Sequence, residues 1–341
     1  MSEAHSDTFD LKDLYDEDID PDPESRADRA KRFLEMNVVA PARIAVDDWR
    51  ALVGGAILAF FLLMGTVGVW LVERPTSGDA PVLAAPFESL AYPLGTDVFG
   101  QPIHAQLIHA TPGMFKMIFA GAVVSVGFAA LVGVVAGFEH GTRIDSFLMT
   151  ITDVVITIPG LPLIIVITAI FQPENPYIVG VFLGIDNWPG LARTVRSQVL
   201  SIREESYVEA SEIMGIPLSS ILRRDILSQL MPYVMINGAL TSRRIIFESV
   251  GLYFLGILPF TTFNWGVMMN LAYEGNALTR PDMLPWMVAP MVCIFLLSFG
   301  LVLLSQGLDS LFNVRLRARH AKTSKKKGTS KNNQSQATGG D

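Results

Sequence analysis

The side chains that could carry chemistry in this sequence are sparse, and they do not form catalytic or metal-binding sets. The chain contains no G-x-x-x-x-G-K-[ST] loop for nucleotide phosphates and no H-E-x-x-H, C-x-x-C or G-x-S-x-G motif. Its one cysteine, Cys293, lies in an apolar run, and its histidines lack metal-ligand spacing: His5, His104, His109, His140 and His320. We therefore expect a chain that is not an enzyme and that binds no cofactor or metal by itself.

Four charged residues lie inside long apolar stretches: Asp153, Arg243, Arg244 and Glu248. Such a charge costs roughly 3 kcal/mol on membrane-insertion scales, and it usually faces a cavity or a partner. Arg244 and Glu248 are four residues apart, so they can pair on one face of a helix. Two interpretations stay open: a neutral pair at a helix–helix contact, or the lining of a translocation path that Asn237 and Arg243 would share. Asp153 is better explained as a capping or interface residue.

The composition indicates which elements must position these residues. Half of the 341 residues are hydrophobic, 17% are charged, and the mean hydropathy is +0.39, whereas soluble domains carry about 25% charged residues. A membrane-spanning helix needs about 20 mostly apolar residues. The sequence therefore predicts an all-α polytopic membrane protein of about six transmembrane helices: 51–72, 117–138, 146–171 (broken by Pro159 and Pro162), a short or broken helix at 177–185, 226–258 and 283–308.

Basic residues are distributed unevenly among the predicted loops. Arg and Lys are frequent before the first span, in residues 193–224 and after residue 314, whereas the predicted outer loops hold few. The positive-inside rule then places both termini in the cytoplasm, with the protein in the cell (plasma or inner) membrane. Residues 1–50 are expected to form an acidic tail, 73–114 an outer loop, 115–310 the transmembrane core and 311–341 a basic disordered tail. The basic tail is expected to lie near anionic lipid rather than to bind nucleic acid.

The stretch between the fourth and fifth predicted spans has the pattern of a cytoplasmic elbow, here residues 203–226. Residues 203–214 suit a helix, Gly215 suits a left-handed helix end, and Pro217 suits the first turn of a second helix. The second half presents four apolar side chains: Ile216, Leu218, Ile221 and Leu222. An elbow that is polar enough to stay outside lipid and that carries these side chains is expected to bind a protein partner.

This elbow resembles the cytoplasmic segment of the inner-membrane permeases of binding-protein-dependent ABC importers. Their signature is Glu-Ala-Ala-x-x-x-Gly followed by Ile-Leu-Pro, and this chain has Glu209-Ala210-Ser211, Gly215 and Ile226-Leu227-Ser228. Ser211 and Ser228 depart from the pattern. The resemblance implies that the elbow is the coupling helix that docks on an ATP-binding subunit, with Glu209, Ala210 and Gly215 in its defining positions.

Further motifs resemble the dipeptide, oligopeptide and nickel permeases of that family. Pro93–Gly100 is similar to their outer PLGTD-x-x-G segment, although the Arg-Asp that is usual after it is Gln101-Pro102 here. Residues 153–159 are similar to their D-x-x-x-x-x-P run, and Trp188-Pro189, Ala192-Arg193 and Arg196 to W-P-x-x-A-R-x-x-R. The long outer loop after the first predicted span resembles that of the C-type subunit.

The resemblance implies a permease subunit of an ATP-driven importer, with di- or oligopeptides as the expected substrates. The expected partners are ATP-binding ABC subunits, a second homologous permease and an extracellular solute-binding protein that docks on the outer loops. Three alternatives stay open: the same importer class carrying nickel or oligosaccharides, a secondary transporter that works without ATP, and a membrane scaffold. A secondary transporter would predict inverted repeats between the two halves, and the sequence shows no convincing self-similarity of that kind.

Overall fold

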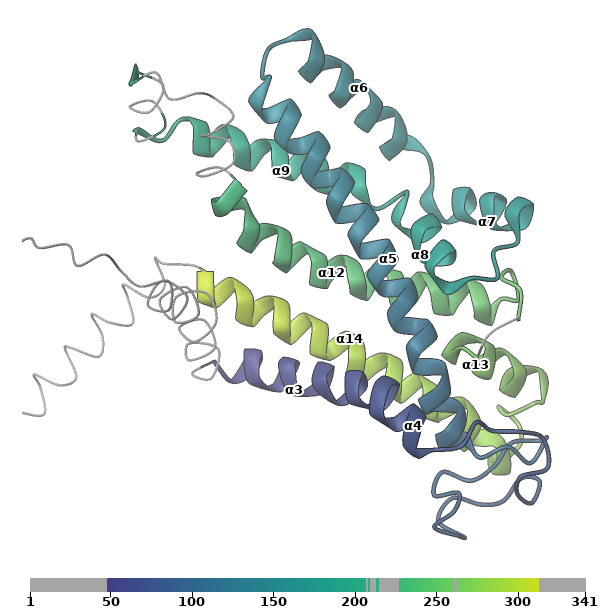
Figure 1. The fold of residues 1–341 in the computed structure, drawn as a ribbon. Helices are drawn as coiled ribbons and strands as arrows, with labels where there is room; N and C mark the ends of the chain where they lie inside the picture. The colour runs from purple at the N-terminus through teal and green to yellow at the C-terminus, as the bar shows by residue number, and fades with distance from the viewer. Residues whose placement is uncertain (1–47, 207, 209–212, 215–226, 261–262, 313–341) are drawn as a thin grey trace, which may run out of the picture. The chain divides into compact units, whose positions relative to one another are not determined.

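The computed structural model describes residues 48–206, 208, 213–214, 227–260 and 263–312. Within these ranges the regular structure is helical, apart from one isolated bridge between Thr96 and Pro102. The all-α fold class is therefore confirmed. The elements are α3 (Trp49–Leu63), the π turn η3 (Met64–Gly68), α4 (Val69–Leu71), α5 (Ile103–Phe138), α6 (Arg143–Thr157), α7 (Gly160–Phe171), α8 (Pro176–Gly184), α9 (Trp188–Arg203), α12 (Leu227–Phe254), α13 (Trp265–Glu274), the 3₁₀ turn η5 (Pro281–Met283) and α14 (Leu284–Phe312) (Figure 1).

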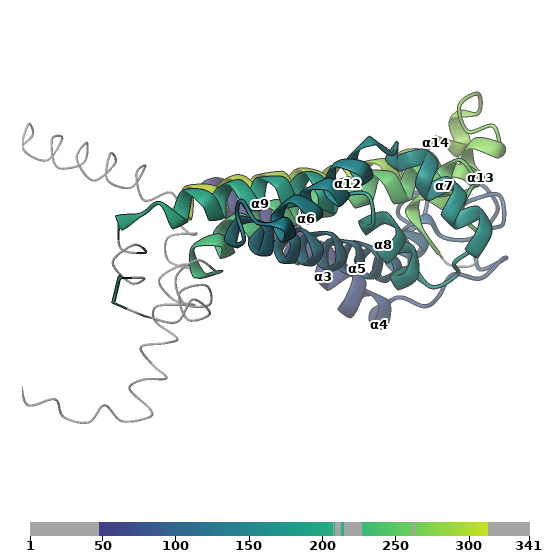
Figure 2. The same ribbon diagram turned by 90° about the horizontal axis from the view of Figure 1, so that it is seen from above.

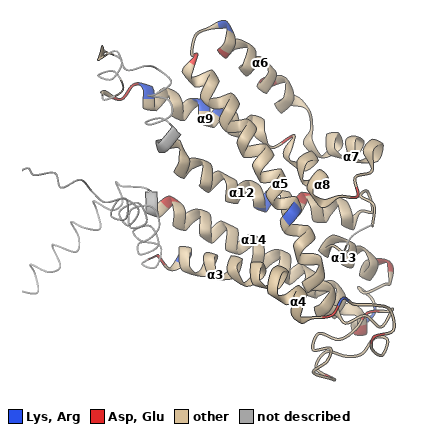
Figure 3. Cartoon of the chain, viewed as in Figure 1, with Lys and Arg blue, Asp and Glu red and all other residues tan. Residues whose placement is uncertain are grey.

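The long helices run between two ends of the described unit. In Figure 1 the start of α3 and the ends of α5, α9 and α14 lie toward one end, whereas residues 73–102 and α13 lie toward the other. Seen from above, α5, α9, α12 and α14 keep the same lengthwise course (Figure 2). Charged residues are scarce along the helices (Figure 3). The chain thus alternates between two ends, which is the course expected of a polytopic membrane protein.

By length and composition, three of the described helices could cross a membrane: Trp49–Leu71, Ile103–Phe138 and Pro281–Ser310. The pair α6–α7 would add a fourth, because it is apolar enough but is bent by 84°. Helix α8 occupies the predicted short fourth span, and α12 the fifth. At 9 residues α8 is too short to cross alone, and the 28-residue α12 is too polar to qualify on composition. The total of about six spans therefore stays a prediction.

Helices α3 and α14 pack through small residues. A Cβ at Gly54 would lie 2.5 Å from the backbone nitrogen of Leu304, and one at Gly307 would lie 2.6 Å from the Cβ of Ala51. Close backbone approach of this kind is how helices gain packing energy in lipid, where the surroundings are as apolar as the side chains. Asp48 adds a polar contact, because its carboxylate accepts hydrogen bonds from the backbone N–H of Arg50 and from the hydroxyl of Ser310.

Helix α5 begins at Ile103, earlier than the predicted start at Met117, so the outer loop ends at Pro102 rather than at residue 114. The polar side chains in residues 103–114 predicted a loop there, but in the fold Gln106 and His109 have hydrogen-bond partners from other segments. His109 Nε2 lies 2.9 Å from the carbonyl oxygen of Val72. Gln106 Nε2 donates to Asp97, and Gln106 Oε1 accepts from the indole N–H of Trp286 at 3.3 Å. Tertiary partners for Gln106 and His109 help the helix to extend beyond its apolar stretch.

The predicted break in the third span lies at Pro159. Helix α6 ends at Thr157, α7 begins at Gly160, and Pro159 is the N-cap residue of α7. Pro162 falls in the first turn of α7, where the missing N–H costs no helical hydrogen bond. The predicted third span is therefore two helices, and only one of its two prolines separates them.

The PLGTD segment of the outer loop forms a compact, internally bonded structure. Gly95 and Gly100 adopt φ angles of +80° and +69°, which L side chains rarely adopt. The hydroxyl of Thr96 donates to the carbonyl oxygen of Pro81 and accepts from the backbone N–H of Ala84 at 2.8 Å. These contacts join the PLGTD segment to residues 81–84 of the same loop, so the segment stabilises the loop conformation.

Asp97 joins this loop to the start of α5. Its buried carboxylate accepts hydrogen bonds from the backbone N–H groups of Phe99 and Gln101 and from the amide of Gln106, each at 2.8 Å. Burial raises the pKa of Asp97 above its ordinary value of 3.8, although these three hydrogen bonds oppose the shift. The folded protein therefore holds the Asp97 proton more tightly than the unfolded chain does.

We predict that Asp97 gives the protein a pH-dependent stability that Asp97→Asn removes. Because the pKa is raised in the folded state, this contribution is fully present below about pH 4 and is lost as the pH rises through the folded pKa. The measurement is the thermal unfolding midpoint of the detergent-solubilised protein between about pH 4 and pH 7. The difference between wild type and variant should shrink as the pH rises. A difference that is constant, or that grows with pH, would contradict the assignment.

Candidate substrate path

The elbow residues predicted to meet an ATP-binding subunit lie outside the described residues: Glu209, Ala210, Gly215, Ile216, Leu218, Ile221 and Leu222. The structure does describe the helix that leads to them. Arg203, the last residue of α9, donates a hydrogen bond of 2.6 Å to the carbonyl oxygen of Phe138, the last residue of α5. Val208 is buried in an apolar cluster with Val199 and Leu230. The end of α9 is thus fixed to the end of α5.

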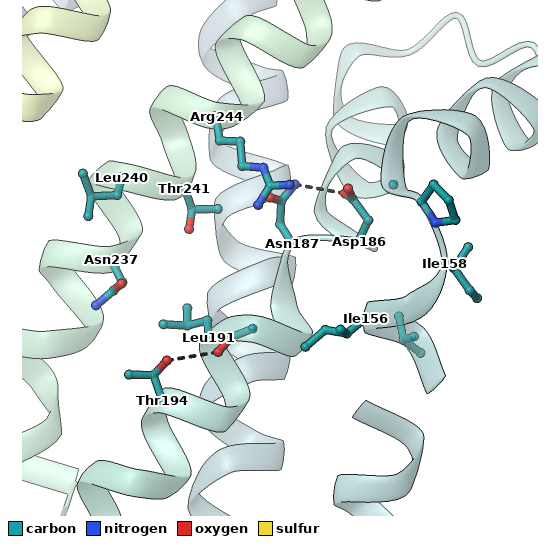
Figure 4. A pocket seen from close by; sticks show the side chains of 14 residues that line it. Ile156, Ile158, Asp186, Asn187, Leu191, Thr194, Asn237, Leu240, Thr241 and Arg244 are labelled. Atoms are coloured by element: carbon teal, nitrogen blue, oxygen red, sulfur yellow. Dashed lines mark hydrogen bonds between the residues drawn. The ribbon is translucent and has the colours of Figure 1, made fainter. Parts of the chain in front are cut away.

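A pocket of about 560 Å³ opens between α12, the break that separates α6 from α7, and the turn that joins α8 to α9 (Figure 4). We call it the polar pocket. Its volume is typical of sites for small molecules, which run from about 300 to 1,000 Å³. Both polar and apolar residues line it: Val155, Ile156, Ile158, Pro159, Gly160, Asp186, Asn187, Gly190, Leu191, Thr194, Asn237, Leu240, Thr241 and Arg244.

The predicted pairing of Arg244 with Glu248 is present. Arg244 Nε donates to Glu248 Oε1 at 2.9 Å. The other oxygen of Glu248 accepts from the amide of Asn187 at 3.1 Å, so α12 is bonded to the turn between α8 and α9. The side chain of Glu248 is 12% exposed and that of Arg244 is 61% exposed. The carboxylate therefore lies at the helix contact, whereas Arg244 lines the pocket. The pair is present, and the translocation path stays a prediction.

The structure separates the other two residues predicted for the path. Asn237 lines the polar pocket, and its amide donates to the carbonyl oxygen of Tyr233 at 2.8 Å. Arg243 is exposed and is not part of the pocket lining. Among the described residues it has no ion-pair or hydrogen-bond partner. Neighbouring positions on a helix point in different directions, so Arg243 does not line the polar pocket together with Arg244.

Sequence reasoning missed the pocket residues on the turn between α8 and α9. Asp186 Oδ1 accepts a hydrogen bond of 3.0 Å from the amide of Asn187, and Asp186, Asn187 and Arg244 all line the pocket. Figure 4 shows Arg244, Asn187 and Asp186 gathered on one side of the pocket. The available signal was a pair of polar residues directly after a short apolar helix, at a place where the chain was expected to lie within the membrane.

A second group of charged residues joins α6 to α9 and includes the two arginines of the W-P-x-x-A-R-x-x-R motif. Arg196 Nε and Nη2 donate to the two oxygens of Asp145, each at 2.7 Å. Arg193 pairs with Asp153, which confirms Asp153 as an interface residue. The two pairs differ in burial: the Asp145 side chain is 7% exposed and the Asp153 side chain 57%. These arginines of the motif hold two helices together.

The helical course and the apolar helices are those of a polytopic membrane protein with a polar pocket among its helices. The family model for the binding-protein-dependent transport system inner membrane component matches residues 129–318, which is more than half of the chain. The chain therefore belongs to this family of membrane permeases.

Curated relatives match most of the chain at modest identity. The dipeptide transport system permease protein DppC of Bacillus subtilis is 31% identical over 66% of this chain and 72% of its own length. The oligopeptide transport system permease protein OppC of the same organism is 27% identical over 78% of this chain and 86% of its own length. A probable peptide ABC transporter permease protein of Sinorhizobium fredii is 30% identical over 86% of this chain and 98% of its own length.

We predict that Arg196→Ala destabilises the protein by about 3 kcal/mol, because it leaves the carboxylate of Asp145 buried without its partner. The matched control is Arg193→Ala, which should cost under about 1 kcal/mol because the Arg193–Asp153 pair is exposed. The measurement is unfolding of the detergent-solubilised variants side by side. Equal losses for the two variants would show that Arg196 contributes no more than a surface ion pair.

Proposed function

We propose that this chain is the permease subunit of an ATP-driven importer for di- and oligopeptides. The observation that carries the proposal is the extent of the match to permeases named for peptides, which reaches 86% of this chain and 98% of the relative in one case. The polar pocket supports the proposal, because charged, amide and aliphatic side chains together suit a zwitterionic ligand with varied side chains. Family membership argues against the secondary transporter and the membrane scaffold.

Nickel is a weaker candidate for the substrate than a peptide. A transition-metal ion is held by several nitrogen, sulfur or oxygen ligands in a set geometry. Within the described ranges, no group of three or more His, Cys, Asp or Glu side chains is placed to hold a metal ion. An oligosaccharide stays the second substrate class, since the amide and hydroxyl groups of the pocket would also suit sugar hydroxyls.

The energy for transport would come from partner subunits. The sequence carries no P-loop, so ATP-binding subunits would have to act through a contact with this chain. That contact is the elbow at residues 203–226, with Glu209, Ala210 and Gly215 shaping it and Ile216, Leu218, Ile221 and Leu222 providing apolar contact. The ends of α5, α9 and α14, which lie toward the same end of the described unit in Figure 1, would then face the cytoplasm, along with both termini.

A second permease would complete the path, and a solute-binding protein would deliver the peptide on the side of residues 73–102. Closure of the ATP-binding subunits would rotate the helices as rigid bodies, so that the path opens alternately to each side. Asn237 and Arg244 line the polar pocket within one subunit, and Glu248 pairs with Arg244 beside it. Arg243, which is exposed and does not line that pocket, would face the second permease or the shared path.

Uptake of labelled dialanine by cells tests the proposed function. Deletion of the gene in its native host should abolish uptake, and the plasmid-borne gene should restore it. Parallel assays use labelled nickel and a labelled oligosaccharide. If deletion leaves dialanine uptake intact but abolishes uptake of one of the other two substrates, the peptide assignment is wrong.

We predict that Glu209→Ala abolishes dialanine uptake while the protein remains in the membrane at its normal level. The reason is that the elbow would no longer transmit movement of the ATP-binding subunits. The matched control is Glu205→Ala, four residues earlier in the sequence at an exposed position, which should leave uptake unchanged. Uptake is measured together with an immunoblot of the membrane fraction. Normal uptake by Glu209→Ala would remove the coupling assignment.

A further inference from the structure

The polar pocket contains one carboxylate that is open to a ligand. Asp186 lines the pocket, and its Oδ1 accepts from the neighbouring amide of Asn187. Its Oδ2 lies against the backbone of Gly160, where any Cβ would collide with the carboxylate. No other residue in the described part of the chain donates a hydrogen bond to Oδ2. A glycine at position 160 is thus what lets the carboxylate occupy this place.

The second carboxylate of the site is already engaged. Glu248 uses one oxygen for Arg244 and the other for Asn187, and its side chain is 12% exposed. Among the described residues that line the pocket, Arg244 is the one cation and Asp186 the one carboxylate. Glu248 lies beside this lining and is paired with Arg244, so the three groups together carry one negative charge in excess. A ligand that brings one positive charge would balance this excess, and Asp186 is the group with free acceptor capacity.

We propose that the polar pocket binds the N-terminal ammonium group of a peptide in transit, with Asp186 as its acceptor. The inference rests on the proposed function, because it takes the peptide as the substrate. An ammonium group donates three hydrogen bonds and carries one charge, which matches the excess at Asp186. A divalent metal ion would instead need six or more oxygen ligands or a tight nitrogen–sulfur set, and an anion would be repelled by the carboxylate excess.

The rest of the lining suits the residues that come after the N-terminus of a peptide. Val155, Ile156, Leu191 and Leu240 offer apolar contacts for side chains, and Asn237 and Thr241 offer polar groups for peptide N–H and C=O. The site specifies one feature that every unmodified peptide shares and leaves its side chains to nonspecific contacts. A permease that carries many peptides needs this division between a fixed anchor and an adaptable lining.

The test measures peptide binding to the purified importer, this chain assembled with its partners in lipid nanodiscs without the solute-binding protein. Trialanine and N-acetyl-trialanine are titrated separately by calorimetry. Wild type should bind trialanine about tenfold more tightly, since a hydrogen bond to a charged group is worth about that factor. Asp186→Asn should remove the preference by weakening trialanine binding alone. Gly160→Ala, which displaces the carboxylate without changing charge, should reduce the preference in the same direction.

The matched control is Asp153→Asn, which removes an aspartate from the α6–α9 interface and leaves the pocket lining intact. It should keep the tenfold preference of wild type. The proposal is overturned if wild type binds the two peptides equally or binds neither, or if Asp186→Asn keeps the preference. None of these results affects the proposed function, which fails separately if deletion of the gene leaves dialanine uptake in cells intact and abolishes uptake of nickel or of the oligosaccharide.

Discussion

The close approach of α8 and α9 to α5 is the contact on which the described unit depends. A Cβ at Gly133 would lie 2.5 Å from the carbonyl oxygen of Ala192, and a Cβ at Gly121 would lie 2.7 Å from that of Gly180. Helices in lipid gain little from burying apolar side chains, so association relies on such backbone proximity. This contact fixes the turn between α8 and α9 and thereby places Asp186 and Asn187 against α12.

The charged side chains within the helical unit are of two kinds. Some are paired with an opposite charge at a helix contact, and one, Asp186, lines a pocket without such a hydrogen-bonded partner among the described residues. Arg196 and Asp145 satisfy each other through two hydrogen bonds and join α6 to α9. On the side of the pocket, Glu248 is bonded by both Arg244 and Asn187, whereas Asp186 keeps free acceptor capacity beside a cavity. Because an unpaired charge within a membrane is costly, Asp186 is the better candidate for a functional group than the paired residues are.

The segment Pro93–Gly100 matches a family motif, and in this structure its side chains stabilise the loop and its connection to α5. Thr96 and Asp97 are buried, and their side chains bond to backbone groups of the loop and to the start of α5. Gln106 continues the connection to Trp286 on α14. The loop, α5 and α14 are thus joined by a chain of polar contacts.

The sequence by itself determined the helical class, the family resemblance, the break at Pro159 and the pairing of Arg244 with Glu248. These features depend on composition over about 20 residues or on neighbours within one helical turn, both of which are local. Only the tertiary structure decided that α5 starts at Ile103, that Arg243 lies apart from Arg244, and that Asp186 borders a pocket. Each depends on partners far away in sequence: Gln106 needs Trp286, and Asn187 needs Glu248. Hydropathy adds up along the chain, whereas a hydrogen bond between distant segments exists only after the helices have packed.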